Sequence, residues 1–214
     1  MSASVRRRPG RRAGMSASDR AFDELAPVEL RHLSQAHWTP IDVAIQVAKL
    51  LSPTRDMRIL DIGAGVGKVC TVGALSSSAT WFGIERHEEL AITAERLARA
   101  LGVSKQTTFL HGDAFSLDWT DFDALYLYNP FELPLFPDAA DEHVHALEYS
   151  VQVTSVEQRL AVMPVGTRVV TYHGFGGVMP ASYELVSQER VPVVGLDLVS
   201  WIQSPRSRRT MVSS

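Results

Sequence analysis

Cysteine is almost absent from this sequence, and so are long apolar runs. The one cysteine among its 214 residues, Cys70, has no partner for an internal disulfide or for a cysteine-based zinc site. This composition predicts a reducing compartment, the cytoplasm. No segment approaches the roughly 18 consecutive apolar residues of a membrane-spanning helix. No apolar segment follows the arginines near the amino terminus, so neither membrane insertion nor secretion is predicted.

Basic side chains are scarce in the body of the chain and gather at its two ends. Five arginines lie in residues 1–14 and three in residues 204–214, and neither stretch contains an acidic residue. Without these eight arginines, 13 basic side chains remain against 24 acidic ones, a net charge of about −11. Nucleic acid binding depends largely on Lys and Arg at the phosphate backbone. The charge therefore disfavours nucleic acid as the ligand of the core.

The composition divides the chain into three regions. Residues 1–36 are predicted to be a basic, partly disordered amino-terminal extension with short helices. Residues 37–203 form one folded domain, and residues 204–214 a basic tail. Both basic ends are interpreted as solubilising segments, with contact to polyanions as the alternative.

Within the domain, helical and strand patterns alternate. Apolar residues at helical spacing predict helices over 39–51, with Thr39 as the cap, over 88–101, and over 138–162. Short apolar runs predict strands over 57–62, 80–84, 107–111, 124–128 and 168–173, and then over 183–191 and 196–203 with no helix between them. This order predicts an α/β fold: a doubly wound, mostly parallel seven-stranded sheet with a C-terminal antiparallel hairpin.

A glycine-rich loop follows the first predicted strand, with the sequence Gly-Ala-Gly-Val-Gly-Lys over residues 63–68. A P-loop needs four residues between its first glycine and the Gly-Lys pair, and then Ser or Thr. Here only three residues separate Gly63 from Gly67, and Val69 follows Lys68. A dinucleotide-binding loop has the pattern Gly-x-Gly-x-x-Gly, which this loop also lacks. The spacing therefore argues against both nucleotide-binding motifs.

Asp61 stands two positions before the loop, at the end of the first predicted strand. A carboxylate there repels a pyrophosphate and attracts an ammonium group. The loop is therefore predicted to receive a ligand with a positively charged amino-acid head and no phosphate. The alternative is a tight strand-to-helix turn that binds no ligand.

The sequence resembles the class I, seven-strand, Rossmann-like S-adenosylmethionine-dependent methyltransferases. The stretch LDIGAGVG is similar to their first motif, in which the backbone approaches the methionine part of the cofactor. Glu85, at the end of the second strand, matches the acid that accepts both ribose hydroxyls. The segment Gly-Asp-Ala-Phe over 112–115 matches the one that contacts adenine, and Asn-Pro-Phe over 129–131 matches the motif facing the methyl group.

This resemblance implies that residues 37–203 are a methyltransferase domain with S-adenosyl-L-methionine as cofactor. The implied cofactor-binding residues are Asp61, Gly63, Ala64, Gly65, Gly67, Glu85, Arg86, Asp113, Ala114 and Asn129. One carboxylate can accept hydrogen bonds from two adjacent hydroxyls, which suits Glu85 to a ribose. The alternative role for Glu85 is that of a helix-capping acid, and for Asp113 that of a turn former.

The loop after the fourth strand bears on the methyl acceptor. Phe131 stands where methyltransferases of planar amides and exocyclic amines carry a second proline, which weakens base and glutamine methylation as activities. A weaker resemblance, to the seven-strand histone-lysine methyltransferases and their prokaryotic relatives, rests on WTPIDVA over 38–44, the Gly-Asp pair, and Asn129 closely followed by Phe131. This sequence has Asn129-Pro130 where that family has two asparagines. The weaker resemblance therefore implies a protein lysine or a small amine, and not a histone, as acceptor.

Three residues are candidates for catalysis. Asn129 would offer its carbonyl oxygen to orient an incoming amine, and Tyr128 would turn a ring face toward the cationic methyl group. His173, at the end of the fifth strand, is the base candidate. The alternatives are a turn residue for Asn129, core packing for Tyr128 and a polar strand end for His173. No metal site is predicted, because His143 and His145 would point to different faces of a helix.

The sequence thus predicts an S-adenosylmethionine-dependent methyltransferase that acts on a nitrogen or oxygen nucleophile of a small molecule or a protein side chain. The alternative is a catalytically inactive, cofactor-binding scaffold or partner subunit with the same fold. A nucleotide-dependent oxidoreductase rests on fold analogy alone and conflicts with the loop spacing.

Overall fold

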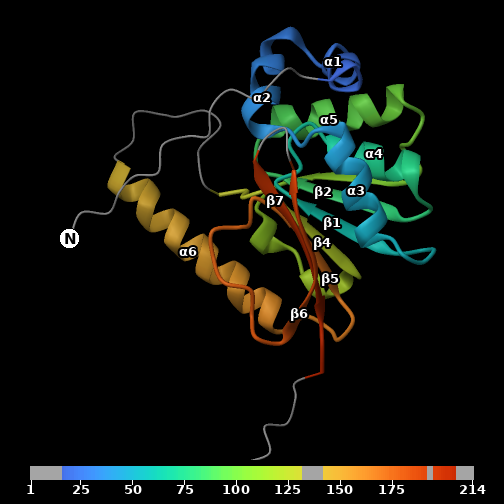
Figure 1. Ribbon diagram of the computed structural model, residues 1–214. Helices are drawn as coiled ribbons and strands as arrows, with labels where there is room; N and C mark the ends of the chain where they lie inside the picture. The colour runs from blue at the N-terminus through green and yellow to red at the C-terminus, as the bar shows by residue number, and fades with distance from the viewer. Residues whose placement is uncertain (1–15, 132–141, 192–194, 206–214) are drawn as a thin grey trace, which may run out of the picture.

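The computed structural model describes residues 16–131, 142–191 and 195–205, in which helices cover both faces of one sheet (Figure 1). On one face lie the helices α3 (Ile41–Leu51), α4 (Lys68–Ser76) and α5 (Glu88–Ala100). On the other face lie the helix α6 (Glu142–Ala161) and the 3-10 turns η2 (Ala114–Ser116) and η3 (Trp119–Asp121). This is the three-layer arrangement that alternating strands and helices predict.

The sheet has seven strands in the order β3-β2-β1-β4-β5-β7-β6. Their bounds are β1 (Arg58–Ile62), β2 (Thr80–Glu85), β3 (Thr107–His111), β4 (Ala124–Leu127), β5 (Arg168–Tyr172), β6 (Tyr183–Val191) and β7 (Leu196–Gln203). The first five are parallel, and β7 and β6 are antiparallel additions. The doubly wound, mostly parallel sheet with a C-terminal hairpin is therefore confirmed.

The last strand of the chain lies inside the sheet, not at its edge. β7 pairs with both β5 and β6, so that Val199 has Thr171 as its partner on one side and Gln188 on the other. β6 becomes the edge strand, and most of its residues are exposed. The two consecutive extended runs predicted a hairpin. They did not predict which of its two strands would pair with β5.

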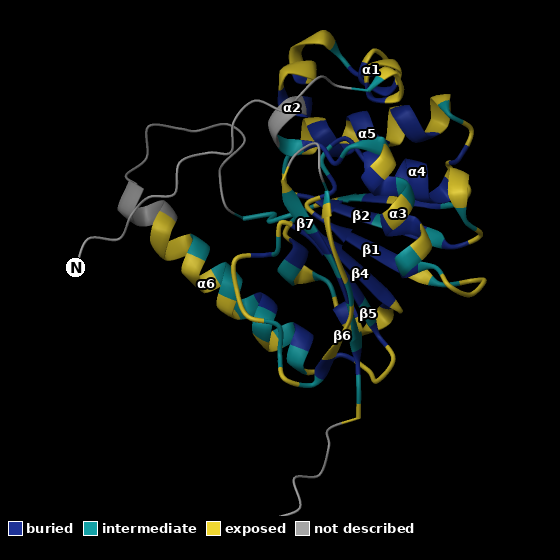
Figure 2. Cartoon of the chain, viewed as in Figure 1, coloured by how far each residue is buried: buried dark blue, intermediate teal, exposed yellow. Residues whose placement is uncertain are grey.

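Alternate residues of the central strands face opposite helical layers. In β1, Ile59 packs against α3, α4 and α5, whereas Leu60 packs on the side of α6, and neither is exposed. Tyr126 and Leu127 of β4 divide in the same way. Full burial of one such side chain stabilises the fold by roughly 1.5–3 kcal/mol. Figure 2 shows the buried strands at the centre, with exposed residues along α6.

The cap predicted for α3 is wrong. The helix begins after Pro40, which makes no side-chain capping bond, and Thr39 lies one residue too early to cap it. Thr39 Oγ1 instead shares a buried hydrogen bond of 2.9 Å with the Tyr126 hydroxyl. The free N–H at the start of the helix, that of Ile41, donates to the carboxylate of Asp19 at 3.0 Å. A distant side chain therefore satisfies the donor that a local cap was expected to satisfy.

The segment over 16–36, which the sequence analysis separated from the domain, packs on it. Its elements are α1 (Ala17–Asp23), η1 (Val28–Leu33) and α2 (Ser34–His37). Phe22, Leu30 and Leu33 are buried in one cluster with Val66 and Leu90 of the body. In Figure 1 these short helices lie above α5 and beside the start of α3.

The helix predicted over 138–162 corresponds to α6. Residues 138–141 lie outside the described part of the chain, as do the side chains of His143 and His145. In the described part of α6, Val156 and Leu160 are buried in the core and Val153 packs against it, whereas Leu147 and Val151 are exposed. Among the described helices, none combines the length and the apolarity needed to cross a bilayer.

Candidate functional site

The predicted site lies at the carboxyl ends of β1, β2 and β4. The strand order reverses between β1 and β4, and ligands of open α/β sheets bind at such a switch point. The glycine loop that follows β1 turns toward β2, because the N–H groups of Gly63 and Ala64 both donate to Ile84 O, at 3.0 and 3.1 Å. The loop and the end of β2 are thereby held side by side.

The three glycines of the loop have positive φ and different surroundings. Gly63 has φ 76° and lies against Pro130 of the loop after β4, which a Cβ would approach to 2.9 Å. Gly65 has φ 56°, and a Cβ there would have no atom within 4 Å. Gly67 has φ 72° and packs on Phe109, which a Cβ would meet at 2.5 Å. Gly65 is thus the loop glycine whose Cβ position is unobstructed, and Gly67 serves close packing of α4 on the sheet.

Glu85 is buried and turned toward this loop. It is 5% exposed, and its Oε2 accepts a hydrogen bond of 2.9 Å from Gly65 N. Its Oε1 accepts a hydrogen bond of 2.9 Å from His87 N, at the start of α5. Glu85 therefore also makes the contact expected of a helix-capping acid. Each carboxylate oxygen has a second lone pair. Glu85 therefore has the position and the acceptor capacity that binding of two ribose hydroxyls requires.

Asp61 is enclosed at the end of β1. The pKa of its carboxyl is raised to about 7. Burial is the main cause, the charge of Glu85 raises the pKa as well, and a hydrogen bond from Cys70 opposes both. Cys70 Sγ lies 3.6 Å from Asp61 Oδ2. Burial, and then the charge of Asp61, raises the pKa of the Cys70 thiol well above its ordinary value, so it stays protonated and donates. An ammonium group is the partner that would best stabilise an ionised Asp61.

The segment after β3 is shaped by local bonds. Asp113 is exposed, and its Oδ1 accepts a hydrogen bond of 2.9 Å from Phe115 N, as its alternative role as a turn former requires. Ala114 is buried, and its carbonyl accepts the indole N–H of Trp119 at 2.9 Å. Arg86 is exposed beyond Glu85. Of these three residues, Ala114 is the one that is buried.

Phe131 and Phe115 join the loops after β4 and β3. Their rings stack with centroids 5.5 Å apart, and Phe115 stacks in turn on Trp119 at 6.0 Å. Arg159 of α6 lies over Phe115 and donates to the carbonyls of Leu117 and Phe115. The residue that replaces a second proline is therefore part of an aromatic stack. The segment over 132–141 lies outside the described residues.

Asn129 has a strained backbone held by long-range bonds. Its φ is 36°, and its N–H donates to Gly174 O of the loop after β5 at 2.9 Å. The hydroxyl of Tyr149, on α6, donates to Asn129 Oδ1 at 3.5 Å. The Tyr149 hydroxyl also lies against Gly176, where a Cβ would approach it to 1.8 Å. Such strain is typical of functional positions.

The other two catalytic candidates have different surroundings. The ring of Tyr128 packs against Tyr172 with centroids 4.8 Å apart, as core packing requires. His173 is exposed, has φ 63°, and donates its backbone N–H to Asp197 O at 3.0 Å. Its positive φ ends β5 at Tyr172. Tyr128 therefore has the packing role that was its alternative, and His173 lies at a polar strand end, as its own alternative states.

Sequence reasoning missed Tyr149, Lys68 and Asp19. Tyr149 reaches Asn129 from a helix 20 residues further along the chain. Lys68 was considered only as part of a P-loop, yet it is 3% exposed and pairs with Asp19. The sequence offered one indication of its importance, namely that Lys68 directly follows the last glycine of the loop. Among the described residues, no group of three His, Cys, Asp or Glu side chains is placed to hold a metal ion.

Comparison with known proteins places this geometry in a family. Residues 19–126, about half of the chain, match the family model described as protein-L-isoaspartate(D-aspartate) O-methyltransferase. The match extends from α1 to β4 and so includes the glycine loop and Glu85. No curated protein matches the chain.

Solved structures share the fold at low sequence identity. An RNA methyltransferase from Salinibacter ruber, in complex with S-adenosyl-L-homocysteine, is 21% identical with a TM-score of 0.56 over 82% of this chain and 99% of that one. TrmN from Thermus thermophilus is 17% identical with a TM-score of 0.61, over 86% of this chain and 53% of that one. A point mutant of MtNAS, in complex with S-adenosylmethionine, is 14% identical with a TM-score of 0.58, over 87% and 72%.

These matches support the broad class of methyltransferases with a Rossmann-like fold. They do not show the narrower resemblance to histone-lysine methyltransferases.

Proposed function

The chain belongs to the protein-L-isoaspartate(D-aspartate) O-methyltransferase family, and from this membership we propose that it methylates a carboxylate oxygen of a protein or peptide. The chain is a methyltransferase that uses S-adenosylmethionine. The proposal concerns the acceptor, for which the sequence left nitrogen and oxygen open.

The placement of Glu85 beside Gly65 is the observation that carries the cofactor site. A buried carboxylate bonded to the loop glycine at which a Cβ would meet no atom is positioned for a ribose. Asp61 lies two residues before the loop and favours the ammonium group of the methionine part. When bound, the cofactor supplies a methyl carbon on a positively charged sulfur. The acceptor oxygen forms a bond to that carbon, and the sulfur leaves with the electron pair of the broken bond.

A carboxylate acceptor needs no general base. Carboxyl groups have ordinary pKa values near 4 and are ionised at neutral pH. They are nucleophiles without losing a proton, so catalysis consists mainly of alignment. His173, the base candidate, is exposed and has φ 63°. A protonated amine or hydroxyl would need a base in contact with it.

Asn129 is compatible with this acceptor class. Its side-chain amide carries a carbonyl oxygen, which accepts the hydroxyl of Tyr149, and an N–H group. The carbonyl oxygen suits an amine, and the N–H group suits a carboxylate oxygen.

The proposed acceptor is a protein or peptide and not a nucleic acid, because the body of the chain is strongly acidic. One structure of the same fold is that of an RNA methyltransferase, so RNA belongs in the test. We also propose a cytoplasmic location, on the single cysteine alone.

The test is a labelling experiment with methyl-labelled S-adenosylmethionine. Purified protein is offered a peptide with an isoaspartyl residue, the same peptide with aspartate, a lysine-rich peptide, and RNA. We expect label in an acidic peptide that mild alkali releases as methanol, because methyl esters hydrolyse and N-methyl groups do not. Glu85→Ala should lose most of this labelling, whereas Glu89→Ala, an exposed carboxylate on α5, should not.

Alkali-stable label, or label in RNA, would overturn the carboxylate acceptor. Binding of S-adenosylhomocysteine with no labelling of any acceptor would favour the inactive scaffold. Calorimetry with Glu85→Ala tests the cofactor site in either case, since the loss of a charged hydrogen-bond partner costs about 1–3 kcal/mol of binding free energy.

A further inference from the structure

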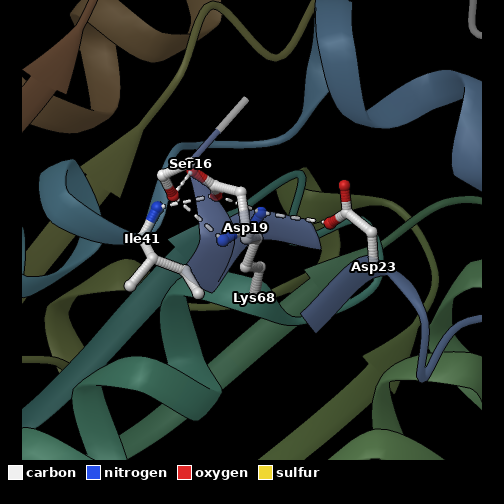
Figure 3. A network of polar contacts seen from close by, with 5 residues as sticks. All are labelled: Ser16, Asp19, Asp23, Ile41 and Lys68. Carbon is white, nitrogen blue, oxygen red and sulfur yellow. Dashed lines mark hydrogen bonds and ion pairs between the residues drawn. The ribbon is translucent and has the colours of Figure 1, made fainter. Parts of the chain in front are cut away.

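Lys68 is a buried cation that the proposed chemistry does not use. It begins α4 directly after the glycine loop, and its side chain lies between two carboxylates of α1 (Figure 3). Lys68 Nζ is 2.6 Å from Asp19 Oδ1 and 3.2 Å from Asp23 Oδ1. All three residues are less than a tenth exposed.

A lysine at this position is costly without those carboxylates. A buried charge loses its hydration, and the amino-terminal end of a helix repels a cation. The rings of Phe22 and Trp38 lie 5.2 and 5.9 Å from Nζ and close the remaining space around it. The pairing with α1 is therefore what permits Lys68 at the start of α4.

Asp19 extends the connection to a third helix. Its Oδ1 also accepts the N–H of Ile41, the first residue of α3, at 3.0 Å. Its Oδ2 accepts the hydroxyl of Ser16 at 2.7 Å. One carboxylate thus links α1 to the beginnings of α3 and α4.

The residue on the other side of Gly67 is anchored to the same segment. Val66 is 1% exposed and packs in one cluster with Phe22, Leu33 and Trp38. The second half of the loop is therefore held by an apolar contact before Gly67 and an ionic contact after it. The first half, over 63–65, carries Gly65, whose Cβ position is unobstructed and whose N–H donates to Glu85.

We propose that Lys68 is a positioning residue for the cofactor: through its contact with Asp19 of α1 it holds the glycine loop in its binding conformation. The inference rests on the chain's use of S-adenosylmethionine and not on the choice of acceptor. The family match begins at residue 19 and so includes Asp19.

The two carboxylates are not equivalent. Asp19 makes the shorter contact and also binds Ile41 and Ser16. Asp23 makes the longer contact, and its Oδ2 is buried with no hydrogen-bond partner in the described structure. With two negative charges against one positive charge, Asp23 is the partner whose neutralisation costs less. The asymmetry provides a matched pair of variants.

The experiment measures the dissociation constant for S-adenosylhomocysteine by calorimetry, with thermal unfolding as the check on folding. We expect Asp19→Asn to weaken binding about tenfold and Asp23→Asn to change it less than twofold. Lys68→Met leaves two buried carboxylates uncompensated and can unfold the chain, so Lys68→Met is combined with Asp19→Asn and Asp23→Asn. This triple variant should fold and bind at least about tenfold more weakly. Glu24→Gln, an exposed carboxylate beside α1, is the control.

Steady-state kinetics separate positioning from a merely structural role. We expect Asp19→Asn and the triple variant to raise the KM for S-adenosylmethionine with kcat unchanged. A structural role would lower the folded fraction, and hence kcat, at constant KM. Wild-type affinity in both variants would overturn the inference. No binding by the wild-type chain would instead contradict the use of this cofactor, and label on another acceptor would leave this inference intact.

Discussion

Asp61 and Glu85 are chemically similar residues to which the fold assigns different environments. Glu85 lies beside the loop with two backbone donors on its oxygens. Asp61 is enclosed against Cys70, and burial raises its pKa to about 7. The difference arises because backbone N–H groups stabilise a carboxylate, whereas a thiol in an apolar setting does so only weakly. One acid is suited to neutral hydroxyls and the other to a cation.

Replacing Asp61 should change the pH dependence of stability. The folded pKa, about 7, lies above the ordinary value of 3.8, so the stability that Asp61 contributes is complete below pH 3.8 and is lost as pH rises to about 7. We expect Asp61→Asn to be as stable as the wild type near pH 4, and more stable by a few kcal/mol above pH 7.

Urea unfolding of the ligand-free protein at pH 4.5, 6 and 8 measures this difference, with the exposed Asp42→Asn as control. A difference that stays constant between pH 4.5 and 8 would contradict the raised pKa.

At the scale of elements, α6 supports the acceptor side of the site. It contributes Tyr149 to Asn129, and Glu157 Oε1 accepts the N–H of Val178 at 2.7 Å. It also packs tightly on the loop after β5, where Cβ atoms at Gly176 and Gly177 would collide with it. The amino-terminal helices support the cofactor side through Lys68. Each half of the site thus depends on a separate helical segment.

Tyr149→Phe should affect the acceptor and not the cofactor. Loss of one neutral hydrogen bond, about 0.5–1.5 kcal/mol, predicts a fall in kcat/KM for the acceptor of about twofold to tenfold. The dissociation constant for S-adenosylhomocysteine should not change, because the hydroxyl of Tyr149 donates to the acceptor loop and not to the glycine loop.

Ser150→Ala, an exposed neighbour on the same helix, is the control. A change in cofactor affinity equal to the change in acceptor kcat/KM would show that Tyr149 acts on the whole sheet edge.

At the scale of the whole molecule, the cofactor should stabilise the folded state. At a free concentration one hundred times its dissociation constant, a ligand adds about 2.7 kcal/mol. For a chain of this size, 1 kcal/mol corresponds to about 2–4 °C in Tm. We therefore expect S-adenosylhomocysteine to raise Tm by about 5–10 °C.

Thermal unfolding with S-adenosylhomocysteine, NAD and ATP at equal concentration provides the comparison. The glycine spacing predicts no shift with NAD or ATP. A shift in Tm with NAD equal to that with S-adenosylhomocysteine would contradict the argument from loop spacing against a dinucleotide ligand.

The sequence predicted the fold, and it named candidate residues for the cofactor site, because both depend on neighbours in the chain. Strand and helix periods predicted the sheet, whose central strands bury alternate residues on two faces. Asp61, Gly65 and Glu85 could be named because each stands at or just after the end of a strand, and the ends of parallel strands lie along one edge. The predicted cap at Thr39 was wrong because two residues distant in the sequence take part. Thr39 hydrogen-bonds to Tyr126, and Asp19 accepts the N–H of Ile41.

Only the tertiary structure decided which distant side chains meet. Lys68 and Asp19 are 49 residues apart, and Thr39 and Tyr126 are 87 apart. The placement of β7 inside the sheet likewise depends on a strand choosing between two possible partners. No period or motif records such pairs, because they are selected by the space and charge left when the elements have packed. The sequence by itself therefore determined the cofactor loop, and tertiary packing determined what holds it.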